Sequence, residues 1–212
     1  MTAPDPRLLR HALALSVASI AWTVVAGVIQ VVVGIRSHLL ALVVLGAAGG
    51  LDAIASAALV VHLRHGQRHD ELADHHERRA TLAVSIGLVI LGVVTLVQSG
   101  LRFASGDHAD ETDVGTAIAL GALVLLPLLA TGKIRVGRAL GTPALVADGW
   151  LSASGAVLAG IAAVSALTAS VESLWWVDPT AASVIAVGAA TYGSIVLRRE
   201  ALNGGARASS HP

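Results

Sequence analysis

One carboxylate interrupts the apolar run HLLALVVLGAAGGLDAIASAALVVHL, residues 38–63. At about 1.5 Å rise per residue, a helix over this run crosses the ~30 Å hydrocarbon layer of a membrane and places Asp52 near its middle. A charge at that depth costs about 2.5–3.5 kcal/mol and persists where it faces a bundle interior, a water-filled cavity or a bound cation. Asp52 is therefore a candidate functional residue. The alternative is a protonated Asp52 that is hydrogen-bonded to a neighbouring helix.

The composition of the whole chain is that of an integral membrane protein. Of its 212 residues, 55% are hydrophobic and only 13% are charged, which lies outside the soluble globular class. The formal net charge of zero excludes a nucleic-acid-binding footprint, and the chain contains no cysteine for disulfides or thiolate metal sites. Any metal site must therefore use oxygen and imidazole ligands.

Successive apolar runs predict an all-α integral membrane fold, a bundle of six transmembrane helices with short loops that forms one domain over residues 1–212. The first run is too long for the core of a cleaved signal peptide. The expected helices cover residues 12–35, 38–63, 80–104, 114–132, 143–168 and 179–197. A histidine-rich loop, 64–79, and a polar tail, 201–212, are expected outside the spans.

Basic residues predict the orientation in the membrane. Twelve of the fourteen fall on the side that holds both termini, including Lys133, Arg135 and Arg138 in an expected loop after the fourth helix. Only Arg36 and Arg102 fall on the opposite side, whose loops are acidic. Because Lys and Arg accumulate in cytoplasmic loops, we expect a multi-pass protein of the cell membrane with both termini in the cytoplasm.

Small residues and caps predict how the helices pack. The pair Gly46 and Gly50, and the pair Gly155 and Ala159, are each four positions apart and allow close contact between helices. Asp178, which is followed by proline, is expected to be the N-cap of the last helix.

Five short motifs occur in an order that resembles the cation diffusion facilitator (cation efflux) family, especially its short members that lack a cytoplasmic C-terminal domain. The resemblance covers roughly residues 8–201. The motifs are DAIAS (52–56), HERRA (76–80), VQS (97–99), KIRVGRALGTPALVADG (133–149) and WWVDP (175–179).

The resemblance implies a six-helix transporter that moves a divalent cation, commonly zinc, out of the cytoplasm, usually as a homodimer and in exchange for protons. No resident cofactor is required. The family site takes two acidic residues four positions apart on the second helix, and a His or similar ligand and an Asp four positions apart on the fifth. Here only Asp52 matches, because the other three positions fall on Ala48, Leu151 and Gly155. The family site is therefore degenerate.

Four oxygen-bearing residues are the candidate metal ligands that remain: Asp52, Ser56, Asp148 and Ser152. Structural zinc sites use about four nitrogen, sulfur or oxygen ligands. A cation held by carboxylate, hydroxyl and water would occupy a weaker, harder site that is less selective for zinc. Loss of the histidine on the fifth helix also leaves no imidazole deep in a span for proton coupling.

The histidine-rich loop offers a possible second metal site, formed by His69, Asp70, Asp74, His75 and His76. Imidazole and carboxylate together are a metal-binding composition. The alternative is a solvated charged loop, because the spacing matches no fixed ligand pattern.

The sequence therefore predicts a secondary transporter that exports a divalent metal cation, with altered selectivity or coupling. The alternative is a transport-inactive, cation-efflux-like membrane protein that acts as an interaction partner or subunit. An enzyme is not expected, because the sequence offers no nucleophile with its base and no phosphate-binding loop.

Overall fold

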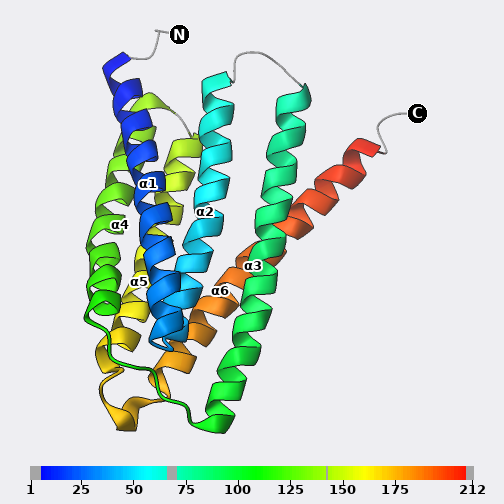
Figure 1. The fold of residues 1–212 in the computed structure, drawn as a ribbon. Coiled ribbons are helices and arrows are strands. Elements are labelled where there is room, and N and C mark those ends of the chain that lie inside the picture. Colours follow the sequence, from blue (N-terminus) through cyan, green and yellow to red (C-terminus); the bar gives the residue numbers. More distant parts are fainter. Residues whose placement is uncertain (1–5, 66–70, 142, 209–212) are drawn as a thin grey trace.

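The computed structural model describes residues 6–65, 71–141 and 143–208, and these residues form helices without any strand. The elements are α1 (Pro6–Arg36), α2 (Leu40–His65), α3 (Glu71–Ser105), α4 (Asp113–Leu140), α5 (Pro143–Thr168), the short 3-10 helix η1 (Glu172–Leu174) and α6 (Val177–Ala208). Figure 1 shows the long helices side by side in one bundle. The predicted all-α, six-helix fold is confirmed.

The helices suit a membrane in length and surface. Five of them are long and apolar enough to cross a bilayer, and α2 contributes a shorter apolar stretch, Leu40–Ile54, among the residues described. Large apolar side chains such as Val28, Val124 and Val157 are more than half exposed. Lipid tails can cover such side chains, so the chain is a multi-pass membrane protein.

Several helices extend beyond the predicted spans. Because α2 reaches His65 and α3 begins at Glu71, most of the predicted loop 64–79 is helical. The expected basic loop after the fourth helix is also wrong, since α4 continues to Leu140, and α6 extends through much of the predicted tail to Ala208. Hydropathy marks the part of a helix in hydrocarbon, whereas good helix formers continue the backbone hydrogen bonds into the polar layer.

The two ends of the bundle differ in their connections. The end at which α1 begins and α6 ends, called here the terminal end, also holds the end of α2, the start of α3, the end of α4 and the start of α5 (Figure 1). The opposite end, called the distal end, carries the α1–α2 turn, the α3–α4 connection and η1. The most extensive helix pairs are α4 with α5, α3 with α6 and α1 with α2. In Figure 1, α6 is inclined to the other helices and crosses behind α3.

Small side chains dominate the core of the distal half. The main cluster joins α2, α4, α5 and α6 through Ala41, Val44, Leu45, Ala122, Ala159, Ala162, Ala181, Ala182 and Ile185. Because lipid and core are similarly apolar, helices in a membrane associate mainly through close packing, which small residues permit. Alanine at these positions allows the four helices to meet closely.

The closest approach of α1 and α2 occurs at Gly46. A Cβ atom added there would lie 2.6 Å from the carbonyl oxygen of Gly27, whereas one added at Gly50 would meet nothing within 4 Å. The predicted contact is therefore confirmed at Gly46, and the backbone nitrogen of Gly50 lies 3.8 Å from a Cβ atom added at Gly27, although a Cβ atom of Gly50 itself would face open space. On α5, Ala159 is fully buried, and Gly155 faces Leu126 at ordinary contact distance.

Asp178 joins four helices at the distal end. Its carboxylate accepts hydrogen bonds from the backbone N–H groups of Leu40 (2.9 Å) and Ala41 (3.0 Å) at the start of α2. It also accepts from the Ser165 hydroxyl of α5 (2.7 Å) and forms an ion pair with Arg102 of α3 (2.8 Å). The carboxylate is almost fully buried, at 5% exposure, so this network replaces water as its solvation.

The prediction that Asp178 is the N-cap of the last helix is wrong. Helix α6 begins one residue earlier, at Val177, and the carboxylate caps α2 instead. The first N–H groups of a helix need acceptors, and a negative charge there also complements the helix dipole. The first turn of α2 carries no acidic residue, so a side chain from α6 supplies the acceptor.

Arg102, the partner of Asp178, also holds the α1–α2 turn. His38 takes a left-handed conformation, with φ of 52°, which reverses the chain within a few residues. Arg102 donates to the carbonyl oxygen of His38. The His38 ring pairs with the Asp110 carboxylate at 2.9 Å, and the Asp110 N–H donates to Ser37 at 2.8 Å. The turn is therefore joined to both α3 and the α3–α4 connection.

The glycine contact predicts a stability difference between two neighbouring substitutions. Gly46→Ala forces α1 and α2 apart and should lower the free energy of unfolding by about 1–3 kcal/mol, as overpacking does. Gly50→Ala is the matched control and should stay within about 1 kcal/mol of the wild type, because alanine favours the helix and meets no neighbour. Unfolding in detergent micelles measures both, and equal losses would contradict the α1–α2 contact.

The Asp178 network predicts a larger effect. Asp178→Ala leaves Arg102, Ser165 and the start of α2 without their acceptor, and should cost about 3–5 kcal/mol, as breaking a buried pair does. Glu172→Ala, an exposed acidic residue of the same end, should change stability by less than about 0.5 kcal/mol. The same micelle assay applies. A loss no larger than that of the control would show that Asp178 does not hold the helices together.

Candidate cation site

Asp52 lies on α2 within the spans. It is half-buried and stands twelve residues after the start of α2, which corresponds to about 18 Å along the helix axis. One turn earlier on the same side of α2, Ala48 packs with Leu51 against residues of α3 and α6. The carboxylate is thus carried on a helix that is packed on several sides.

A buried ammonium group lies nearer the terminal end. Lys133 of α4 is 1% exposed, and its Nζ lies 2.8 Å from Oδ2 of Asp148 on α5. The same nitrogen donates to the hydroxyl of Ser19 on α1 at 2.8 Å and to the hydroxyl of Ser152 on α5 at 3.0 Å. Three oxygen atoms from two helices therefore surround the charge.

The local sequence explains why Lys133 reaches these oxygens. Asp148 and Ser152 are one turn apart on α5, and the Ser152 hydroxyl also lies 3.1 Å from the carbonyl oxygen of Asp148. Gly149 brings α4 and α5 together, since a Cβ atom there would lie 3.1 Å from the carbonyl oxygen of Ala130. The close helices let one lysine side chain bridge them.

The lysine cluster and Asp52 influence each other electrostatically. Asp148 and Lys133 are the two charged groups that act on the Asp52 carboxylate. Coulomb interactions decay slowly in a medium of low dielectric constant, so charges within the spans sense one another without direct contact. The membrane interior thus holds two carboxylates and one ammonium group in one electrostatic unit.

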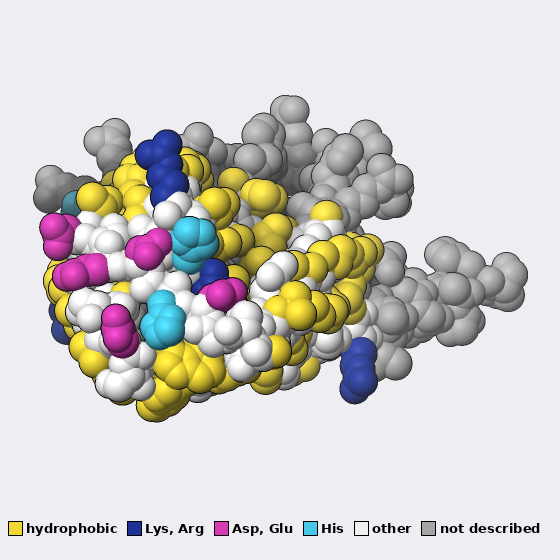
Figure 2. All heavy atoms as spheres, turned by 60° about the horizontal axis from the view of Figure 1, so that its bottom comes forward, with side chains coloured by type: hydrophobic (Ala, Val, Ile, Leu, Met, Phe, Trp, Pro, Cys, Tyr) yellow, Lys and Arg dark blue, Asp and Glu magenta, His cyan; other side chains and the backbone are white. Residues whose placement is uncertain are grey.

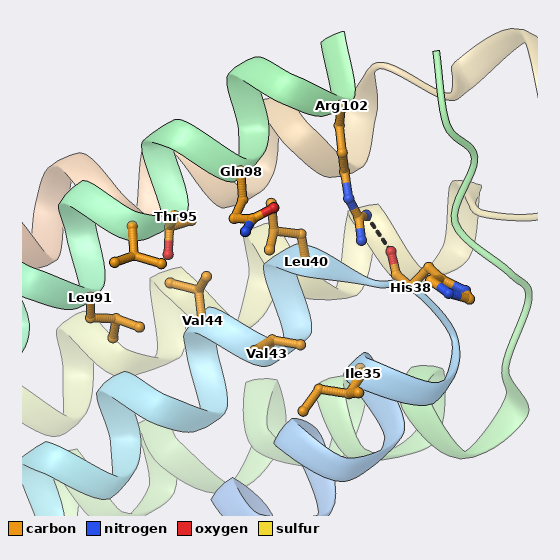
Figure 3. Close-up of a pocket in the computed structure, with 11 residues that line it drawn as sticks. Ile35, His38, Leu40, Val43, Val44, Leu91, Thr95, Gln98 and Arg102 are labelled. Carbon is orange, nitrogen blue, oxygen red and sulfur yellow. Dashed lines mark hydrogen bonds between the residues drawn. The ribbon is translucent and has the colours of Figure 1, made fainter. Parts of the chain in front are cut away.

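A cavity of about 320 Å³ lies elsewhere, at the distal end between α1, α2 and α3 (Figure 3). Leu40, Val43, Val44 and Leu91 make its wall largely apolar. It meets α2 between Leu40 and Val44, two turns before Asp52. This cavity therefore gives no access to the carboxylate.

Comparison with known proteins identifies the family. The profile of the cation efflux transmembrane domain matches residues 16–203. This chain belongs to the cation efflux family. The chain is also 29% identical over 170 residues to the "Uncharacterized transporter YdbO" of Bacillus subtilis (strain 168), an alignment that covers 77% of this chain and 58% of that relative. The chain therefore spans less than two thirds of the relative's length, and the family resemblance is confirmed.

The four ligand positions implied by the family resemblance are mostly apolar in this cation efflux protein. Ala48 packs against α3 and α6, Gly155 is half-buried beside Leu126, and Leu151 is half-buried. These three side chains offer no oxygen, nitrogen or sulfur to a cation. Asp52 is the one position of the four that can bind a cation.

The structure brings together two of the candidate ligands predicted from the sequence. Asp148 and Ser152 both contact Lys133, and the charges of Asp148 and Lys133 act on Asp52. Ser56 stands one turn after Asp52 on α2, but its side chain lies outside the described part of the chain. Within the described residues, no group of three His, Asp or Glu side chains could hold a metal ion.

The proposed second metal site falls mainly outside the described side chains. His69 and Asp70 lie in the segment 66–70, which the structure does not describe. Asp74, His75 and His76 belong to the first turns of α3, where only the backbone is described. Their role in metal binding stays a prediction.

Sequence reasoning missed the role of Lys133 and Ser19. The sequence predicts Lys133 in a basic cytoplasmic loop, whereas the structure buries it in α4. The sequence does contain a pattern that indicates this burial. Ala130, Lys133 and Gly137 follow helical spacing and so share one face of a helix, and all three are buried. Lys133 is also the only lysine in the chain.

Proposed function

We propose that this chain is a secondary transporter that exports a divalent metal cation across the membrane. The observation that carries the proposal is Asp52, a half-buried carboxylate within the spans, about 18 Å along α2 from the start of that helix. Ionisable groups inside a membrane protein mark ion pathways by default, because burying them is costly. Membership of the cation efflux family supports the same function.

Zinc is the first candidate among divalent cations, as the family resemblance implies. The available donors are the oxygens of Asp52, Asp148 and Ser152, with Ser56 on the next turn of α2. Oxygen ligands suit hard cations such as magnesium and manganese, whereas tight zinc sites commonly use histidine or cysteine. We therefore propose a site that binds zinc more weakly, and with lower selectivity, than a site with histidine ligands.

Exchange with protons is part of the proposal, with the carboxylates as the groups that exchange them. Among the residues whose side chains are described, the histidines His11, His38 and His108 lie toward the two ends of the bundle, away from Asp52. A carboxylate that releases a cation can accept a proton instead, since either ion neutralises it. A homodimer and a metal-binding histidine segment also belong to the proposal, on the family resemblance and the composition of residues 69–76.

The second candidate function is that of a transport-inactive partner or subunit. One observation favours it, namely that the Lys133 ammonium group holds Asp148 and Ser152 in a buried ion pair. Together with three apolar family positions, this pairing leaves Asp52 as the main charge available to an ion. A flux measurement distinguishes the two candidates.

The distal end supports the proposed orientation. Figure 2 views this end and shows acidic side chains spread over it. The exposed acidic residues there are Asp107, Asp110, Glu111, Asp113 and Glu172. Arg135, Arg138, Arg198 and Arg199 lie toward the opposite end, on the last turns of α4 and on α6. This asymmetry favours cytoplasmic termini and an external distal end.

Removal of the Asp52 charge tests the transport function. In proteoliposomes loaded with a metal-sensitive dye, Asp52→Asn should reduce zinc or manganese flux to background, because the amide cannot neutralise a cation. Its stability should stay level or rise, since the variant avoids an insertion cost of about 2.5–3.5 kcal/mol. Asp113→Asn, at the exposed distal end, should retain flux. Wild-type flux in Asp52→Asn would refute the role of Asp52 as a ligand, and absence of flux in the wild type would favour the inactive partner.

Cysteine labelling tests the orientation. The chain has no native cysteine, so Glu111→Cys introduces a single thiol at the distal end. A membrane-impermeant maleimide should label it in intact cells, because the positive-inside asymmetry predicts an external distal end. Arg135→Cys, exposed on the last turns of α4, should be labelled only after permeabilisation. The reverse pattern would invert the topology.

A further inference from the structure

We propose that Lys133 is a tethered competitor of the transported cation: its ammonium group occupies an oxygen cage formed by Ser19, Asp148 and Ser152, and an ion binds there only when Lys133 leaves. The identity of the competing ion rests on the proposed function. The occupancy of the cage by Lys133 does not, because it follows from the geometry alone.

The coordination of the ammonium group is complete. An ammonium group has three N–H donors, and three oxygens lie within 2.8–3.0 Å of Nζ: one carboxylate oxygen of Asp148 and the hydroxyls of Ser19 and Ser152. With Lys133 1% exposed, the protein provides the solvation that water would give. The cage is therefore a formed cation site with a cation inside it.

The chemistry of the cage also suits a free ion. A carboxylate and two hydroxyls are oxygen donors of the kind that bind hard cations such as Mg²⁺, Mn²⁺ and Ca²⁺. These ions bind oxygen at about 2.0–2.6 Å, which is shorter than the observed nitrogen–oxygen distances. An ion would therefore draw the three ligands inward once the lysine had moved out.

The choice of lysine fits this role. The chain carries thirteen arginines and one lysine, and the lysine stands at the most buried basic position among the described residues. An ammonium group is a compact point charge on a flexible stem, whereas guanidinium is planar and broad. Lysine thus resembles a small spherical ion more closely, and its stem allows it to withdraw.

Asp52 connects the cage to the proposed transport function. Its carboxylate is subject to the charges of both Lys133 and Asp148. While Lys133 pairs with Asp148, their charges cancel and Asp52 supplies the net negative charge of the unit. A divalent ion in the cage would therefore be opposed by Lys133 and favoured by its departure. Competition of this kind lowers the apparent affinity for the ion. The apparent affinity equals the intrinsic affinity multiplied by the fraction of molecules in which the cage is free.

Binding measurements on the purified full-length chain in nanodiscs test the competition without any flux assay. The probes are Zn²⁺ and Mn²⁺, measured by equilibrium dialysis. Lys133→Gln should bind at least one of them about tenfold more tightly than the wild type, because the cage is vacated. Arg135→Gln removes one positive charge from the exposed face of the same helix and should leave the affinity unchanged. Lys133→Gln/Asp148→Asn should lose the gain.

A second measurement uses the wild type, so it does not depend on whether a variant folds. Because Lys133 is the only lysine, an amine-reactive reagent followed by peptide mass spectrometry reports on this side chain apart from the N-terminus. Lys133 should be protected without metal and become reactive with saturating Zn²⁺ or Mn²⁺ at constant pH. Asp148→Asn should make it reactive without metal.

Two results would overturn the proposal. One is an unchanged affinity in a folded Lys133→Gln variant. The other is metal binding to the wild type that leaves Lys133 protected. A tighter Lys133→Gln variant in a chain that shows no flux would sustain the competition and refute only the proposed transport function.

Discussion

The carboxylate of Asp178 is the constraint on which the distal half of the bundle depends. From its place on α6, it caps the start of α2 and forms an ion pair with Arg102 of α3. It also accepts a hydrogen bond from the Ser165 hydroxyl of α5. A buried charge is tolerated only when such partners replace water. Once the four helices meet at this point, the small residues of the distal core can pack, and the direction in which α2 carries Asp52 into the membrane is set.

A second buried ion pair, between Lys133 and Asp148, links helices toward the terminal end. Lys133 of α4 bridges α1 and α5 through Ser19, Asp148 and Ser152. The two pairs differ in their chemistry. Arg102 and Asp178 form a junction with backbone groups at a helix start, whereas the Lys133 cage consists of side-chain oxygens around a flexible ammonium group. The first arrangement suits a permanent clamp, and the second can exchange its cation.

Asp52 lies between these pairs on α2, and its surroundings explain how this chain departs from the pattern implied by its family. At the positions of the missing ligands, Ala48 and Gly155 contribute to helix packing. The polar groups of α5 lie closer to the terminal end, at Asp148 and Ser152. Inside the membrane, an ammonium group of the protein itself thus neutralises a buried carboxylate.

The sequence by itself determined the membrane class, the six helices and the family, because hydropathy and short motifs are local properties of the chain. Apolar runs must cover the hydrocarbon layer whatever their neighbours are. It also singled out Asp52, Asp148 and Ser152, since polar residues within spans are visible without a fold. The helix ends were less predictable, because helices continue into the polar layer where hydropathy gives no signal.

Only the tertiary structure decided which groups neutralise the buried charges. Asp178 caps a helix that begins 138 positions earlier in the chain, and Lys133 donates to Ser19 across 114 positions. Local patterns suggested a cap for the last helix and a loop lysine, and both predictions were wrong. Burial makes a partner obligatory for a charge, but which group becomes that partner depends on how the helices pack, and helix packing brings together residues that are far apart in the sequence.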